Sequence, residues 1–399
     1  MSAAPRVIPL RPADRPAPGI AAPLPLSLYI HFPWCVRKCP YCDFNSHEAR
    51  GGIPEDDYVG ALIADLESAL PSIWGRRVST VFIGGGTPSL LSPQALERLL
   101  EAVRSRVNLL PQAEITLEAN PGTVEAQRFA GFRAAGVNRL SLGIQSLDDR
   151  HLAALGRIHD AAAARAAIEA ALRHFDNVNL DLMYALPGQT LDEARRDIEE
   201  AAASGVAHVS AYHLTLEPNT PFHHSPPAGL PDPDLAADMQ VAVEEILAGC
   251  GFEHYETSAF ARPGMRCRHN LNYWRFGDYL GIGAGAHGKL SFHDRIVREA
   301  RHRHPQAYLE GVARGDALQT RAPIAEEDLP MEFMMNALRL NDGFPPPLFA
   351  ERTGLSPEAL RRPLEQAAAR GLVEITPERI RPTELGRRFL NDLLELFCP

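Results

Sequence analysis

Three cysteines near the start of the chain are the residues whose spacing most directly indicates chemistry. Cys35, Cys39 and Cys42 follow the apolar segment 26–32 in the order Cys-x3-Cys-x2-Cys, and Tyr41 stands directly before the third. Three thiolates on so short a loop can converge on one metal centre, but a structural zinc site has four protein ligands. A cubane iron–sulfur cluster has four irons, and thiolates are its usual ligands. The spacing therefore favours a [4Fe-4S] cluster with one iron open to a small molecule.

Two other interpretations of these cysteines stay open at the level of sequence. A zinc site could be completed by His31 or His47, or two of the cysteines could form a disulfide and leave one thiol free. The remaining cysteines, Cys250, Cys267 and Cys398, are dispersed along the chain. The chain thus lacks a disulfide framework, which is typical of a protein of the reducing cytoplasm.

The segments that position the cysteine loop alternate between expected strands and expected helices. Apolar, β-branched segments recur between residues 26 and 218, and amphipathic segments that begin at capping residues separate them. About six strand–helix units predict an α/β fold, a parallel sheet with helices outside that curls into an incomplete (β/α)6 barrel. The expected strands after 26–32 are 78–83, 114–119, 138–145, 177–185 and 207–218.

Polar and glycine residues gather at the ends of these expected strands. The sequence GGGTP at 84–88 follows the second strand, Glu118 and Gln145 end the third and fourth, and Asp181 lies near the end of the fifth. Because barrels of this kind place their sites at the C-terminal ends of strands, we expect one site that gathers these residues with the cysteines. Taken singly, each polar residue is equally compatible with capping or ion pairing, and the glycines with a simple turn.

The cysteine loop resembles that of the radical S-adenosylmethionine (SAM) superfamily. In that family the open iron is chelated by the methionine part of SAM, and one electron from the cluster splits SAM to give a 5′-deoxyadenosyl radical. LEANPGT, SLGIQS, LGRIH and NLDLMYALPGQT resemble, in order, segments of its coproporphyrinogen oxidase-like branch. The resemblance extends over nearly everything from Leu26 to the end of the chain.

The resemblance implies a role for each residue of a SAM pocket. The glycine-rich segment binds the amino group of SAM, Glu118 contacts the ribose, and the tyrosine of SLYIH lies beside SAM. A carboxylate suits ribose hydroxyls, and arginine suits a carboxylate. The implied SAM-binding residues are Tyr29, Gly85, Gly86, Thr87, Glu118, Gln145, Arg157 and Asp181.

Two departures within that branch favour its heme chaperones. Phe44 stands two places after the third cysteine, where the porphyrinogen oxidases carry a further cysteine. The segment HNLNYW resembles a motif of the chaperones, which implies heme contacts by His269, as an axial ligand, and by Tyr273 and Trp274. From the residues alone, the simpler interpretation is a buried polar corner with a core aromatic pair. We expect His287 to belong to a polar loop.

The function expected from the resemblance is that of a cytoplasmic heme chaperone. It would bind a [4Fe-4S] cluster, SAM and heme, and deliver heme to apo-hemoproteins such as respiratory enzymes. The alternative is an enzyme, oxygen-independent coproporphyrinogen III oxidase, in which the radical takes hydrogen from a propionate and carbon dioxide leaves. The sequence leaves open whether the chain is an enzyme, which client it serves and whether it forms a homodimer.

Composition excludes two other classes of partner. The net charge is −10 and the arginines are scattered among acids, so we expect no nucleic-acid backbone to bind. No apolar run reaches membrane-spanning length, so we expect no direct membrane anchor.

We expect four parts along the chain. They are a disordered, proline-rich leader at 1–25, the barrel at 26–225, an extension with the HNLNYW motif at 226–314, and a mostly helical, winged-helix-like module at 315–399. A DNA-binding regulator built on that module is a third class of function. Its candidate recognition helix, 356–371, mixes Arg361 with glutamates and is interrupted by Pro363, which favours an accessory lid or partner surface instead.

Overall fold

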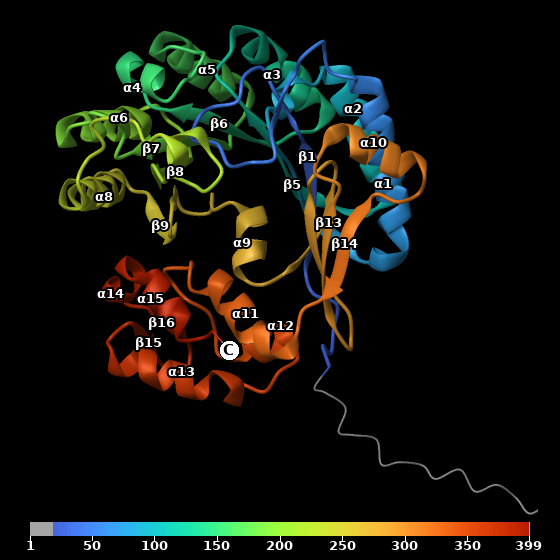
Figure 1. Cartoon of the computed structure of the whole chain (residues 1–399), viewed down its shortest axis with the longest axis vertical. Coiled ribbons are helices and arrows are strands. Elements are labelled where there is room, and N and C mark those ends of the chain that lie inside the picture. The colour runs from blue at the N-terminus through green and yellow to red at the C-terminus, as the bar shows by residue number, and fades with distance from the viewer. Residues whose placement is uncertain (1–18, 399) are drawn as a thin grey trace, which may run out of the picture.

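A computed structural model of the protein describes residues 19–398, without the side chains of 123–125, and its centre is a parallel sheet. The six strands pair side by side in chain order, all parallel. They curl around a common axis with helices on the outside (Figure 1). The expected incomplete (β/α)6 barrel is thereby confirmed. The strands are β1 (Leu26–Phe32), β4 (Arg77–Gly85), β5 (Asn108–Ala119), β6 (Arg139–Gln145), β7 (Val178–Tyr184) and β8 (His208–His213).

Several of the helices between these strands begin at residues whose side chains cap them. The Ser92 hydroxyl accepts from the Ala95 N–H, and Pro93 occupies the first turn, where its missing N–H costs nothing. Gly136 ends its helix in the left-handed conformation, with φ 108°. The outer helical segments are α1 (Glu55–Ile73), η1 (Pro88–Leu90), α2 (Pro93–Arg106), α3 (Thr123–Ala135), α4 (Asp149–Ala154), α5 (Ala161–His174) and α6 (Leu191–Ala203).

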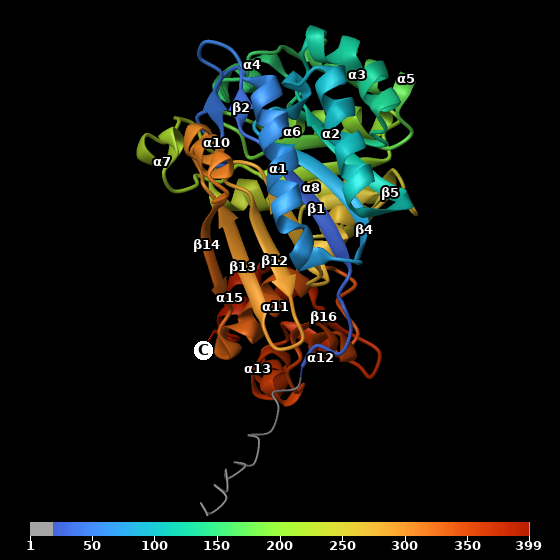
Figure 2. The same ribbon diagram turned by 90° about the vertical axis from the view of Figure 1, so that its right-hand side faces the viewer.

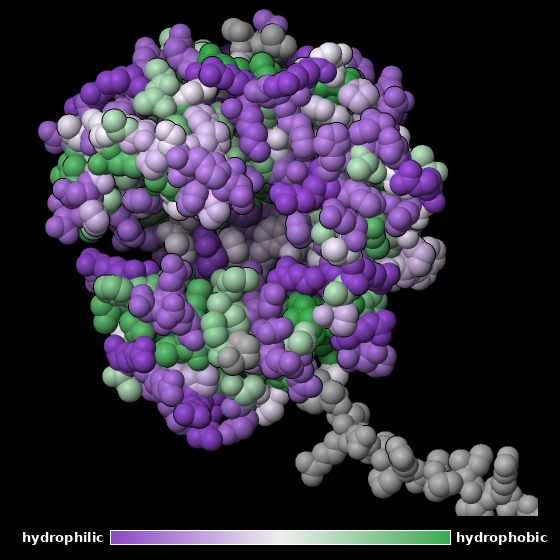
Figure 3. Space-filling model, viewed as in Figure 1, coloured by the Kyte–Doolittle hydropathy of each residue, from purple (hydrophilic) through white to green (hydrophobic). Residues whose placement is uncertain are grey.

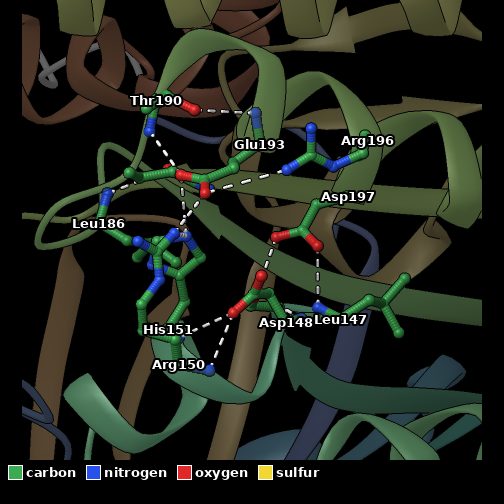
Figure 4. Close-up of polar contacts among 11 residues, drawn as sticks. Leu147, Asp148, Arg150, His151, Leu186, Thr190, Glu193, Arg196 and Asp197 are labelled. Atoms are coloured by element: carbon green, nitrogen blue, oxygen red, sulfur yellow. Dashed lines mark hydrogen bonds and ion pairs between the residues drawn. The ribbon is translucent and has the colours of Figure 1, made fainter.

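A polar junction joins the start of α4 to the start of α6 (Figure 4). Asp148 caps α4 by accepting from the Arg150 and His151 N–H groups. Thr190 and Glu193 form a reciprocal capping box at α6, and Glu193 also pairs with Arg150. The junction therefore fixes the loop that follows β6, at the end of the sheet where the site is expected.

Antiparallel strands extend the sheet to twelve strands. Beside β1, the strand β11 (Asp278–Ile282) runs parallel, and β12 (His287–Ser291), β13 (Ile296–Arg301) and β14 (Leu318–Pro323) continue antiparallel. Figure 2 shows these last three strands side by side. At the other edge lie β10 (Ala259–Ala261) and β9 (Glu253–Glu256), while β2 (Trp34–Cys35) and β3 (His47–Glu48) flank the cysteine loop. The remaining helices of this part are α7 (Pro221–His224), α8 (Pro233–Gly249), α9 (Arg268–Trp274) and α10 (Pro305–Ala313).

Buried ion pairs hold the extension against the barrel. Asp65 of α1 pairs with Arg301 of β13 at 3.2 Å and accepts from the Tyr308 hydroxyl at 2.9 Å. Asp278 pairs with Lys289 at 2.9 Å, and all of these side chains are buried. A buried charge that loses its partner destabilises a fold strongly, so the Asp65–Arg301 pair fixes β13 against α1, and the Asp278–Lys289 pair joins β11 to β12.

The C-terminal module has a hydrophobic core that also includes Phe276 and Ile296 of the extension. Residues 318–323, within the range expected for the module, form β14 of the large sheet. The module's helix α13 runs through Pro363, which was expected to interrupt it. The last two helices of the module are separated at Phe389 (φ −113°, ψ 45°). The elements are η2 (Glu326–Asp328), α11 (Leu329–Ala337), α12 (Pro347–Thr353), α13 (Glu358–Ala369), β15 (Val373–Ile375), β16 (Ile380–Pro382), α14 (Glu384–Arg388) and α15 (Leu390–Glu395).

The expected leader, 1–25, lies for the most part outside the described residues. Where the structure does describe it, the chain already contacts the fold: Leu24 is buried, and the Ile20 N–H donates to the His293 carbonyl at 3.1 Å. Ile20 and Leu24, within the expected leader, therefore pack against the fold. Among the helices within residues 19–398, none combines the length and the apolar composition that crossing a bilayer requires.

Candidate functional site

A cavity of about 380 Å³ opens at the C-terminal ends of the parallel strands. It brings together the three cysteines of the loop and nearly all of the residues implied for SAM. Tyr29 lines a neighbouring, larger cavity instead. The expected site residues on the smaller cavity are Cys35, Cys39, Cys42, Gly85, Gly86, Thr87, Glu118, Gln145, Arg157 and Asp181.

The cysteines are free thiols, and their three sulfurs do not all lie within 4.8 Å of one another. Cys35, Cys39 and Cys42 form no disulfide and are each partly exposed. Among the described residues, the one group of potential ligands that all lie within 4.8 Å of one another is Asp148, His151 and Glu193, which excludes the cysteine trio. Thiolates on one zinc ion would be about 3.8 Å apart, from Zn–S bonds of about 2.3 Å. Sulfurs that bind different irons of a cluster are farther apart, so the trio fits a cubane better than zinc.

The two histidines that could have completed a zinc site, His31 and His47, are not arranged with the cysteines to do so. The His31 Nδ1 lies 3.0 Å from the Tyr29 hydroxyl, and its Nε2 donates to the Asn45 carbonyl at 2.9 Å. Neither ring nitrogen of His31 is free to bind a metal, and no group of metal-ligand geometry within residues 19–398 includes His47. The group that does have such geometry is the helix junction of Figure 4, where the Arg150 cation already pairs with Glu193.

The glycine-rich segment after β4 is held tightly against the cysteine loop. The Gly86 N–H donates to the Phe32 carbonyl and the Thr87 N–H to the Trp34 carbonyl, both at 2.7 Å. A Cβ on Gly86 would lie 2.5 Å from the Trp34 oxygen, so only glycine fits there. The Gly85 N–H donates to Glu118 at 2.9 Å. The N–H groups of Gly85, Gly86 and Thr87 are thus used within the protein, which leaves carbonyl oxygens, the partners that an ammonium group needs.

Two carboxyl groups face this cavity from β5 and β7. Burial, reinforced by the nearby Asp181, raises the pKa of Glu118 to about 8. Burial also raises the pKa of Asp181, although Ser141 and Asn179 each donate a hydrogen bond to it at 2.9 Å. Without a ligand, Glu118 is therefore mostly protonated near neutral pH and can act as a hydrogen-bond donor or an acceptor.

A hydrogen-bonded chain runs from Arg157 to two of the cysteines. Arg157 donates to the Gly143 carbonyl and to the Asn120 side chain, both at 2.7 Å, and to the Cys39 sulfur at 3.6 Å. Asn120 in turn donates to the Thr87 hydroxyl at 2.8 Å, and Thr87 donates to the Cys35 sulfur at 3.5 Å. Asn120 was not predicted, although its place in NPGT, two residues after Glu118 and just past a strand end, could have signalled it.

Gln145 has an unusual backbone conformation at the end of β6. Its φ is 69°, in the left-handed region that non-glycine residues seldom adopt. Such a strained backbone conformation persists only where the surrounding structure holds it in place. Residues of this kind are found most often at functional sites. The left-handed turn interrupts the regular β6–β7 register next to Gly143, and it brings the Gln145 side chain to the cavity.

A second, larger cavity of about 840 Å³ adjoins the first. The two cavities share Asp43, Phe44, Gly85 and Glu118 as lining residues. The larger one lies among β12–β14, α9 and α11, where the surface is hollowed between the barrel and the C-terminal module (Figure 3). Aromatic residues of this cavity are Tyr29, Phe44, Tyr273, Trp274, Phe276 and Tyr279.

The HNLNYW segment forms α9, and only part of it faces the larger cavity. Tyr273 and Trp274 line the cavity, as implied for heme contact. His269 does not, and it is only 1% exposed. Its Nδ1 lies 2.8 Å from the Thr80 hydroxyl and its Nε2 2.9 Å from the Tyr273 hydroxyl. His269 thus does not meet the cavity in this conformation, because both ring nitrogens already have protein partners, and its implied role as an axial ligand stays a prediction.

Another histidine and several cations do reach the cavity. His287, at the start of β12, is exposed there, and burial together with Arg298 and Arg303 lowers the pKa of its imidazole. Arg298 donates to the Tyr279 hydroxyl at 2.8 Å and pairs with Glu332 of α11. Arg303 is exposed on the rim. The sequence prediction assigned His287 to a polar loop and named neither arginine.

Comparison with known proteins identifies the family. The Radical SAM superfamily model matches residues 29–201, and the HemN C-terminal domain model matches residues 324–389. The chain is 50% identical to a protein of Escherichia coli K12 named heme chaperone HemW, over 94% of this chain and 98% of that protein. It is 47% identical, with the same coverage, to the protein of that name from Haemophilus influenzae.

A solved structure of a related enzyme has the same fold over nearly its whole length. Escherichia coli coproporphyrinogen III oxidase, HemN, described as a radical SAM enzyme, matches with a TM-score of 0.79 and 25% identity. The match covers 96% of this chain and 92% of that one. The barrel, the cysteine loop at its mouth and the similarity to curated relatives agree: this chain belongs to the radical SAM superfamily and, within it, to the family of the HemW proteins.

Proposed function

We propose that the protein is a heme chaperone of the cytoplasm, which binds a [4Fe-4S] cluster, SAM and heme and passes heme to apo-hemoproteins such as respiratory enzymes. The observation that carries this proposal is a pair of adjoining cavities in a member of the HemW family. One cavity has the sulfur and polar lining of a cluster and SAM site. The other has the size and aromatic lining that a planar macrocycle requires.

The smaller cavity offers a partner for each part of a cluster with SAM. Cys35, Cys39 and Cys42 would bind three irons and leave the fourth open, and the glycine-rich segment would accept hydrogen bonds from the SAM ammonium group. Glu118 would bind the ribose hydroxyls, while Gln145, Arg157 and Asp181 would close the pocket around SAM. The cluster would supply one electron to SAM when both are bound.

The larger cavity suits the chemistry of heme. Tyr29, Tyr273, Trp274 and Tyr279 offer aromatic faces and edges to a porphyrin plane, and cationic side chains lie within reach of propionates. Because Phe44 lines both cavities, the two ligands would lie on either side of the same short loop. We propose that the delivery of heme depends on the contact between the two cavities. A change at the cluster would reach the heme site through Phe44.

The second candidate function is oxygen-independent coproporphyrinogen III oxidase. The observation that favours it is the TM-score of 0.79 to HemN over nearly the whole chain. Phe44 argues against it, because the oxidases that the chain resembles carry a cysteine at that place. DNA binding has no such support: Arg361 on α13 is paired with Glu358 and Glu365, which neutralises the candidate recognition helix.

Heme titration of the reconstituted protein tests the proposal. The full chain is rebuilt anaerobically with iron and sulfide, and ferric heme is added in steps while the Soret band is followed. We expect saturation near one heme per chain, and transfer of that heme to an apo-hemoprotein in a mixing experiment. Binding no stronger than to a non-specific control protein would contradict the proposal. Formation of protoporphyrinogen from coproporphyrinogen III, with SAM and a reductant, would instead support the oxidase.

A further inference from the structure

One wall of the larger cavity is formed by β12 and β13, and His287 on this wall is exposed to the cavity. On β12, residues that alternate along the strand face the cavity, and these are His287 and Lys289. Ala300 on β13 lies directly opposite His287 and also lines the cavity. Gly285 precedes His287 by two residues, on the same wall. Because His287 is exposed and its cross-strand neighbour Ala300 is small, its imidazole faces the open space of the cavity.

The ring of His287 has no competing partner. Two histidines line the cavity, His31 and His287. Both ring nitrogens of His31 lie at hydrogen-bond distance from protein groups, as described above, and it is only 5% exposed. Within residues 19–398, the structure gives the His287 imidazole no hydrogen bond, so a nitrogen is free to bind a metal. His269, the histidine of the HNLNYW motif, is absent from the lining and bonded at both nitrogens.

The basic side chains of the cavity also differ in whether they already have an ion-pair partner. Lys289 is paired with Asp278, and Arg298 is paired with Glu332. The Arg303 guanidinium, exposed on the rim, makes no ion pair with any residue of the described part of the chain. A carboxylate that enters the cavity can therefore bind Arg303 without displacing a partner.

We propose that His287 is the axial ligand of the heme iron and that Arg303 binds a heme propionate. This inference rests on the proposed function, since it names the residues that hold the heme in the larger cavity. Neutral imidazole is a common ligand of heme iron, and the small Ala300 opposite His287 leaves room for a flat ring to approach it. The porphyrin then lies over the floor formed by Gly285 and Ala300, with Tyr273 and Trp274 on α9 beside it.

The role of His287 as the axial ligand is tested by spectroscopy on the His287→Ala variant. The full chain, rebuilt with its cluster, is titrated with ferric heme, and the visible and EPR spectra of the bound iron are recorded. We expect wild-type protein to show a nitrogen-ligated iron, and the variant to bind heme about tenfold or more weakly with a changed spin state. Added imidazole should restore the wild-type spectrum, which a merely structural role would not allow. His293→Ala is the matched control, because that side chain is 87% exposed on the next turn and lies outside the cavity lining.

The propionate contact is tested with an esterified ligand. Arg303→Gln should weaken the binding of heme about tenfold and leave the binding of heme dimethyl ester unchanged, because the ester has no carboxylates. Arg295→Gln, at the exposed end of the same hairpin, is the matched control and should affect neither ligand.

The outcomes separate this inference from the proposed function. If the wild-type protein binds no heme, the proposed function fails and this inference with it. If the wild-type protein binds heme and His287→Ala leaves the spectrum and the affinity unchanged, the proposed function stands and His287 is not the ligand. A changed spectrum in His269→Ala alone would likewise overturn the assignment to His287.

Discussion

Arg157 donates a hydrogen bond to the sulfur of Cys39 at a distance of 3.6 Å, and thereby joins the loop after α4 to the cysteine loop. The same guanidinium holds the Gly143 carbonyl and the Asn120 side chain. Through these three hydrogen bonds, Arg157 supports the cysteine loop. This support does not depend on what Arg157 contacts on a bound ligand.

Replacing Arg157 with alanine should destabilise the protein and weaken its hold on iron. The change leaves buried acceptors without a donor, which costs about 1–3 kcal/mol in the free energy of unfolding. Chemical denaturation and the iron-to-protein ratio after reconstitution measure the two effects. Arg165→Ala is the control, because its exposed pair with Glu200 is worth at most about 1 kcal/mol. Equal iron retention in Arg157→Ala and wild type would contradict the supporting role.

The stability of the metal-free protein should depend on pH through Glu118. Its pKa is about 8 in the fold and near 4.5 in the unfolded chain. Between these values the folded state binds a proton that the unfolded state lacks, so the stability that this proton provides is full below pH 4.5 and is lost as pH rises toward 8.

Glu118→Gln isolates this effect, because glutamine keeps an oxygen for the Gly85 N–H. Relative to the variant, the wild-type protein should lose about 3 kcal/mol of unfolding free energy between pH 5 and pH 8. Denaturant titrations at several pH values measure the difference. The exposed Glu101→Gln is the control and should follow the wild type. A wild-type curve parallel to that of Glu118→Gln would refute the raised pKa.

His269→Ala should act mainly on the stability of the fold. The substitution removes the ring bonded to Thr80 and Tyr273 and opens a buried space beside Phe82, at a cost of about 2–4 kcal/mol. Tyr273→Phe and Thr80→Val each remove one of the two partners and should cost about 1 kcal/mol apiece. Thermal unfolding ranks the three variants. A His269→Ala protein of full stability would show that the ring is not held as the structure has it.

Asn45→Ala should loosen the connection between the cysteine loop and the floor of the larger cavity. The Asn45 amide donates to the Ala284 carbonyl at 2.9 Å and to the Arg303 carbonyl at 2.8 Å. Without these bonds, amide hydrogen exchange around 283–287 should accelerate by about tenfold, since the cost of local opening falls by about 1.4 kcal/mol. Mass-spectrometric exchange of that peptide measures the change. Asn341→Ala, which removes a bond to the His254 carbonyl elsewhere, should leave the peptide unaffected.

Sequence reasoning located the cysteine loop and the barrel because both depend on local pattern. The spacing of Cys35, Cys39 and Cys42 alone limits what they can bind, and alternating strand and helix segments fix a parallel sheet through the rules of chain connection. Glu118, Gln145 and Asp181 could be assigned to one cavity from their places at strand ends, since parallel strands end at a common edge. Asn120 and Asn45 were missed because their importance lies in partners far along the chain.

The residues that reach the larger cavity were decided by tertiary structure. Whether His269 or His287 meets the larger cavity depends on the rotation of α9 and on the pairing of β12 with β13, and neither follows from a motif. The sequence by itself determined which chemistry the cysteine loop favours and on which scaffold it is mounted. Only the packing of β11–β14 against the barrel decided which imidazole is free, because burial and hydrogen bonding depend on neighbours that the linear sequence does not specify.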